Sequence, residues 1–177
     1  MVMLNKFDEY IKELKESLNS NIEIKWIEKQ NRHIGLFQIN NNIYQLDFNL
    51  KCDSWSYKFY FINNKDNKIT LKVNKTDFKY DSFKVLATAK KGLIRFIDKN
   101  SPNAVVFSAH NEGNDYPTKR MSIYQQILTS LIDEFPDYNY KIDNISNIQI
   151  YIVYKEKLKN VDFTFNNIKE IIEDYIN

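Results

Sequence analysis

The chain has 177 residues, of which 25 are Lys or Arg and 23 are Asp or Glu, and its formal net charge of +2 argues against a general nucleic-acid-binding protein. Hydrophobic residues make up 43% of the chain, which lets one domain spanning 1–177 bury a sizeable core. A lone cysteine, Cys52, excludes a disulfide and a cysteine-based zinc site within one chain. No apolar run approaches the ~18 residues of a membrane helix, so we expect no membrane contact.

The first half of the chain predicts one helix and a series of strands. Residues 1–19 are expected to form an amphipathic helix, because apolar side chains recur there every three or four positions. In 22–74, apolar and polar residues alternate, which predicts an antiparallel strand meander. Its expected strands are 22–26, 33–39, 44–50, 55–61 and 69–73. The separators are polar and short enough for hairpins.

The second half predicts a helix–strand–helix–strand unit at 81–154. An apolar stripe from Val85 to Ile97 marks the first helix, and "AVVFSA" (104–109) is typical of a central strand buried on both faces. The segment "DEFPDYNY" (133–140) is interpreted as a break before the last strand, and 163–176 as a closing helix. The expected fold is therefore α/β (α+β), a mixed, mostly antiparallel sheet flanked by helices. If strand 69–73, the helix and strand 104–109 form one crossover unit, those two strands are parallel.

A polar loop follows the central strand. Ligands gather at the carboxyl ends of parallel strands, so this loop and the helix start after it are a candidate ligand or partner site. Its residues are His110, Asn111, Glu112, Lys119 and Arg120. An ordinary strand-to-helix turn is the alternative interpretation. The loop acids match no ligand spacing around His110, so no metal site is predicted.

A basic stripe marks the polar side of the first helix of this unit. Lys84, Lys91 and Arg95 recur there at helical spacing. Such a face can contact nucleic acid or an acidic partner, and an exposed helix face in water is the plain alternative.

The block from "FKVLATAKKGLIRF" to "SIYQQI" resembles a family of uncharacterised tailed-phage proteins. The shared pattern is an aromatic meander, a helix, a Pro-led "FSA" strand, a loop with a Lys/Arg pair and a helix, and it covers most of 22–154. The matching residues are Val85, Thr88, Phe96, Pro102, Phe107, Ser108, Ala109, Arg120 and Tyr124. The resemblance implies origin in a phage or another mobile element, with location in the bacterial host cytoplasm or the virion.

The element order is also similar to that of GNAT-type N-acetyltransferases. In that family a Leu-Tyr pair lies on the helix after the strand and loop, and Ile123-Tyr124 holds this place. The resemblance implies acetyl-CoA as cofactor and Tyr124 as general acid. The family's pyrophosphate-binding loop is Gly-rich, whereas the corresponding segment here, 75–83, has no Gly, and its side chains would crowd a backbone–phosphate contact. Tyr124 also lies on the apolar stripe of its helix, where core packing is the alternative role.

The sequence therefore favours a non-catalytic accessory protein that works by protein–protein contact, as a virion component or an inhibitor of a host system. No cofactor is expected under this interpretation, and a phage or host protein is the expected partner. The alternative is a GNAT-type acyltransferase that uses acetyl-CoA.

Overall fold

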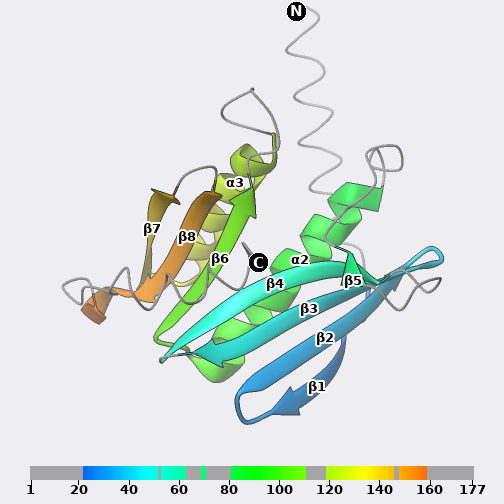
Figure 1. Ribbon diagram of the computed structural model, residues 1–177. Coiled ribbons are helices and arrows are strands. Elements are labelled where there is room, and N and C mark those ends of the chain that lie inside the picture. Colours follow the sequence, from blue (N-terminus) through cyan, green and yellow to red (C-terminus); the bar gives the residue numbers. More distant parts are fainter. Residues whose placement is uncertain are drawn as a thin grey trace, which may run out of the picture. The chain divides into compact units, whose positions relative to one another are not determined.

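The computed structural model describes residues 22–51, 53–62, 69–70, 81–110, 119–145 and 148–158 (Figure 1). The helices expected at 1–19 and 163–176 lie outside these residues. The elements in chain order are β1 (Lys25–Lys29), β2 (Arg32–Ile39), β3 (Asn42–Lys51), β4 (Ser54–Ile62), β5 (Ile69–Thr70), α2 (Asp81–Asn100), β6 (Ala104–His110), α3 (Lys119–Glu134), β7 (Tyr138–Ile145), β8 (Ile148–Lys155) and the 3-10 turn η1 (Glu156–Leu158). The expected α+β class, with a mixed sheet and flanking helices, is confirmed.

The strands pair in the order β1-β2-β3-β4-β6-β8-β7, and β5 pairs with β4. Pairing is antiparallel where β5 meets β4 and parallel where β4 meets β6, at Trp55↔Val105 and Ser56↔Val106. The described residues therefore do not form the parallel crossover that was considered for strand 69–73, the helix and strand 104–109, because β5 is antiparallel to β4 and β4 is the parallel neighbour of β6. The cause is non-local: β5 pairs with β4 at Phe61 and Ile62, whereas β6 pairs with β4 at Trp55 and Ser56.

One strand was missed. The segment 133–140 was interpreted as a break, but α3 ends at Glu134 and β7 begins at Tyr138, so the break is three residues long. β7 is the last strand in the pairing order of the described residues and pairs antiparallel with β8, from Tyr138↔Lys155 to Ile145↔Ile148. Its polar side chains alternate with Tyr138, Tyr140 and Ile142, as expected for a strand with one covered face.

The described residues group into two compact units, and β3 and β4 contribute to both. The first unit includes β3 as far as Asp47 and α2 as far as Asp98. In this unit, α2 covers one face of the strands (Figure 1). Leu46 on β3 is fully buried and lies against Gly92 of α2. His33 on β2 is buried and meets Phe96 of α2 edge-on, with 5.5 Å between ring centroids. Asn40 has a φ of 54° in the hairpin turn between β2 and β3, a conformation that Asn tolerates better than most residues.

The second unit contains Phe48–Lys58 and the described residues from Lys99 onward. Val105, Val106 and Phe107 of β6 are buried, which confirms the prediction of a central strand. Phe107 stacks on Tyr151 of β8, its pairing partner, at a centroid distance of 5.1 Å. The hydroxyl of Tyr138 donates a hydrogen bond of 2.8 Å to the carbonyl oxygen of Pro102, which ties the start of β7 to the turn before β6.

Candidate functional site

Tyr124, the residue that the acetyltransferase resemblance marks as a general acid, lies in an aromatic cluster of the second unit. Its side chain is only 9% exposed. Its ring meets Phe107 and Tyr151 edge-on, at centroid distances of 5.8 and 5.6 Å. Such edge-to-face pairs add stability beyond the burial of their area. The ring of Tyr124 therefore packs in the core of this unit.

Polar groups of Tyr57, Tyr151 and Gln149 are buried in or beside this aromatic cluster. Tyr57 on β4 meets Phe107 at a centroid distance of 6.0 Å. Burial raises the pKa of the Tyr57 phenol well above the usual 10.0, and the nearby Tyr124 raises this pKa further. The Tyr151 hydroxyl donates to Gln149 Oε1, and Gln149 Nε2 donates to Asn144 Oδ1 at 3.2 Å. At neutral pH Tyr57 is a protonated phenol, which can donate a hydrogen bond but cannot act as a base.

The candidate loop falls largely outside the described residues. His110 is the last residue of β6, and Lys119 and Arg120 are the first two residues of α3, while the side chains of these three residues are not described. Asn111 and Glu112 lie outside the described residues altogether. The backbone thus places His110 at the carboxyl end of β6 and the two cations in the first turn of α3, as the sequence predicts.

The basic stripe lies on α2 in the first unit. Lys84 and Arg95 are exposed, whereas Lys91 is partly buried. Arg95 lies over the Trp26 ring of β1, with 5.1 Å from its guanidinium carbon to the ring centroid. This cation–π contact holds the Arg95 side chain against the strand, so the three residues do not form one uniformly free basic face.

A second surface of the first unit lies on the sheet face opposite α2. The register of β1 and β2 pairs Trp26 with Gly35, and a Cβ at Gly35 would meet both Trp26 and Leu46, so these residues point toward α2. The alternate residues point to the opposite face. They form three cross-strand pairs, Lys25↔Leu36, Ile27↔Ile34 and Lys29↔Arg32, which we call the Ile27 face. Lys25, Ile27, Lys29 and Arg32 are exposed, and Ile34 and Leu36 are partly buried.

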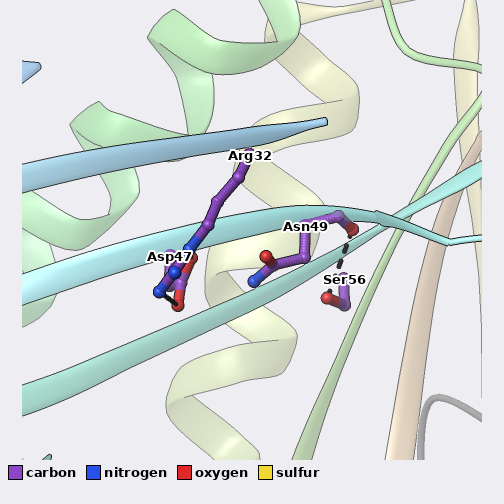
Figure 2. Close-up of polar contacts among 4 residues, drawn as sticks. All are labelled: Arg32, Asp47, Asn49 and Ser56. Carbon is purple, nitrogen blue, oxygen red and sulfur yellow. Dashed lines mark hydrogen bonds and ion pairs between the residues drawn. The ribbon is translucent and has the colours of Figure 1, made fainter. Parts of the chain in front are cut away.

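An ion pair links the Ile27 face to β3. Figure 2 shows Arg32 and Asp47 pointing toward one another from neighbouring strands, with Arg32 Nε donating to Asp47 Oδ1 at 3.0 Å and Nη2 to Oδ2 at 2.8 Å. The Asp47 side chain is 7% exposed and that of Arg32 is 47% exposed. Two parallel charge-assisted hydrogen bonds fix the plane of the guanidinium. In the second unit, Ser56 Oγ donates to the Asn49 carbonyl oxygen at 3.3 Å, also drawn in Figure 2.

Sequence reasoning missed the Ile27 face and the Arg32–Asp47 pair. In the sequence, Asp47 is one of the polar residues that alternate with apolar residues along the expected strand 44–50. The signal was present in the types of residue: Asp is uncommon in strands, and a basic residue stands across the hairpin, 15 positions earlier. Within the part of the chain that the structure describes, no group of three or more His, Cys, Asp or Glu side chains could hold a metal ion. Neither of the described α-helices is long and apolar enough to cross a membrane.

Comparisons of the chain with protein-family models, with curated proteins and with solved structures found no match. The geometry of the described residues is therefore the basis for the functional proposals below.

Proposed function

We propose that the protein is a non-catalytic accessory protein of a phage or another mobile element, and that it acts by protein–protein contact in the virion or against a host system. The Ile27 face carries this proposal. Ile27 is 48% exposed in the middle of β1, and its cross-strand partner Ile34 and the nearby Leu36 extend the apolar surface.

This surface has the composition of a contact site. Single exposed aliphatic residues are ordinary on protein surfaces, but adjacent ones on a rigid sheet form a patch that another protein can cover. Protein interfaces combine an apolar centre with a polar rim. Here Ile27, Ile34 and Leu36 supply the apolar part, and three cations on the same two strands supply the charged part.

The test is a measured affinity for an identified partner. The tagged protein captures proteins from infected host cells, the captured protein is purified, and the dissociation constant of the reconstituted pair is measured. We expect Ile27→Ser to weaken binding at least tenfold, since a central apolar contact is lost. Leu50→Ser is the matched control, because Leu50 is also an exposed aliphatic residue, at 36%, but lies on β3 outside the Ile27 face. An unchanged affinity in Ile27→Ser would overturn this role of the face.

The second candidate is a GNAT-type acyltransferase with acetyl-CoA as cofactor and Tyr124 as general acid. The position of Tyr124 favours it: α3 follows β6, β6 runs parallel to β4, and the Tyr124 ring lies against Phe107 of β6. The burial of Tyr124 favours a packing role in the core instead. Acetyl-CoA binding, argued in the Discussion, discriminates between the two candidates.

A further inference from the structure

We infer that the partner segment that binds the Ile27 face is acidic, with two carboxylates that flank an aliphatic residue. This inference rests on the proposed function and specifies the chemistry of the partner. It follows from the charges of the face, their spacing along β1 and the position of the apolar side chains between them.

The charges of the face are positive in excess. Lys25, Lys29 and Arg32 are its three cations, and Asp47 on the neighbouring strand neutralises Arg32 through two hydrogen bonds. The three cations and Asp47 together leave two positive charges. These belong to Lys25 and Lys29, whose side chains are exposed at the two ends of β1. A partner that brings negative charge to both ends would complement these two lysines.

The spacing of these charges matches an extended chain. Lys25, Ile27 and Lys29 are alternate residues of one strand, so the two lysines lie ~13 Å apart with Ile27 midway, at a rise of ~3.3 Å per residue. A second extended segment has the same rise and the same alternation. An acid, an aliphatic residue and a second acid at positions i, i+2 and i+4 would therefore meet Lys25, Ile27 and Lys29 in turn.

Each end of this arrangement has a defined chemistry. At one end, Lys29 lies across from Arg32, whose charge Asp47 neutralises, so the Lys29 ammonium is the cation that meets one carboxylate of the partner. At the other end, Lys25 lies across from Leu36, which leaves one cation beside an aliphatic side chain. Complementary charge of this kind favours the correct partner and speeds association.

A nucleic acid fits this face less well than an acidic protein segment. The centre of the Ile27 face is aliphatic, and its six residues include no aromatic ring on which a base could stack. A phosphate backbone laid across Ile27 and Ile34 would lose hydration over apolar side chains without a hydrogen-bond donor in return. The apolar centre is instead suited to an aliphatic side chain of the partner.

The test uses two short synthetic peptides and a charge swap. One peptide has the core Glu-Thr-Ile-Thr-Glu, and its matched control has Lys in place of each Glu. Both are titrated into the 15N-labelled full chain at low ionic strength, where weak charge-dependent binding is detectable by NMR. We expect the acidic peptide to shift the amide signals of 25–36, and the basic peptide to leave them unchanged.

Charge reversal should move the preference to the other peptide. The double variant Lys25→Glu/Lys29→Glu should lower the affinity for the acidic peptide at least tenfold and should bind the basic peptide. Lys84→Glu with Lys91→Glu on α2 changes the net charge equally at a different surface, and should leave the affinity unchanged. The melting temperatures of both double variants serve as folding controls, since Lys25, Lys29 and Lys84 are exposed and Lys91 is partly buried.

Three results would overturn the inference. The first is no shift at 25–36 with the acidic peptide, and the second is binding that survives the reversal of Lys25 and Lys29. The third is binding of a single-stranded or duplex DNA oligonucleotide that shifts the amide signals of 25–36 and is lost when Lys25 and Lys29 are changed to Glu. That result would assign the face to nucleic acid. The proposed function fails separately, when Ile27→Ser leaves the affinity for the captured partner unchanged.

Discussion

Gly92 of α2 lies directly against Leu46 of β3, and a Cβ at Gly92 would overlap Leu46 Cδ1. Leu46 has little freedom to move away, because it is fully buried and its Cδ1 also lies 3.4 Å from the place of a Cβ at Gly35. Two glycines, one on the helix and one on the neighbouring strand, therefore make room for one leucine. This contact sets how closely α2 approaches the sheet in the first unit.

The contact predicts that Gly92→Ala destabilises the protein although Ala is the better helix former. Helix propensity favours Ala by ~1 kcal/mol, whereas an overlap in a packed core costs ~1–3 kcal/mol, so we expect a net loss of ~1 kcal/mol. Denaturant unfolding measures the change. In a Leu46→Ala background, Gly92→Ala should stabilise by up to ~1 kcal/mol, since the overlap is gone. Equal destabilisation in both backgrounds would contradict the packing argument.

The Arg32–Asp47 pair predicts a coupling energy. Arg32→Ala leaves a buried carboxylate with fewer donors, so we expect a loss of ~1–2 kcal/mol in the free energy of unfolding. The double variant Arg32→Ala/Asp47→Ala should cost less than the sum of the single variants by ~1 kcal/mol, since Arg32 is half exposed and water screens it. A double-mutant cycle by urea unfolding measures this coupling. Additive effects would show that the two hydrogen bonds contribute little.

How far the sequence predicts this structure differs between local and non-local features. Alternation predicted β2, β3 and β4 closely, and continuous apolar runs predicted β6 and β8, because one or both faces of each strand are buried. β7 was missed because Pro136 and the acids Asp133, Glu134 and Asp137 precede it, and because its polar residues are typical of an edge strand. The parallel neighbour of β6 could not be read from local pattern, because pairing depends on how the chain returns to the sheet.

The same contrast between local and non-local features holds for the Ile27 face. The alternation of "KWIEK" was visible, but only the pairing of β1 with β2 shows that Ile27 lies beside Ile34, between Lys25 and Lys29. Arg32 and Asp47 are 15 residues apart, and a hairpin brings them together. Tyr124 was predicted either as a general acid or as a core residue, and the structure places its ring in the aromatic cluster.

The raised pKa of Tyr57 predicts lower stability at alkaline pH. The unfolded chain releases this phenol's proton near pH 10, while the folded protein retains it because burial, and then Tyr124, raise the pKa. Above pH 10 the unfolded state therefore binds fewer protons, and the free energy of unfolding falls by up to ~1.4 kcal/mol per pH unit. Below pH 10 this stability is fully present.

The control for this prediction is a second tyrosine. Tyr57→Phe should flatten the fall in stability between pH 10 and 11.5, whereas Tyr140→Phe should preserve it, because Tyr140 is 38% exposed. Urea unfolding at each pH gives the slope. An identical alkaline slope in the wild type and in Tyr57→Phe would contradict the assignment of this titration to Tyr57.

Acetyl-CoA separates the two candidate functions. Under the leading proposal, millimolar acetyl-CoA leaves the melting temperature unchanged, because 75–83 has no Gly to let a phosphate approach the backbone. A true cofactor at ~100 times its dissociation constant would add ~2.7 kcal/mol of stability. A saturable rise in melting temperature, together with acyl transfer that Tyr124→Phe abolishes, would favour the acyltransferase instead. Coenzyme A without the acetyl group is the matched control.

The loop between β6 and α3 supplies the last prediction. Phe107→Ala should cost ~3–5 kcal/mol, because Phe107 is 6% exposed and stacks on Tyr151, so its loss opens a cavity. His110→Ala, Glu112→Ala and Arg120→Ala should each stay within ~0.5 kcal/mol if these side chains serve binding rather than packing. Urea unfolding measures all four variants.

Partner capture then decides what the loop does. If the loop belongs to the partner-binding surface, the three mild substitutions should weaken the reconstituted complex although the fold is intact. Ser130→Ala, a partly buried position on α3 beyond the first turn, is the control for a change in the same helix. Full affinity in all three loop variants would show that the loop only connects a strand to a helix, and would leave the Ile27 face as the contact surface.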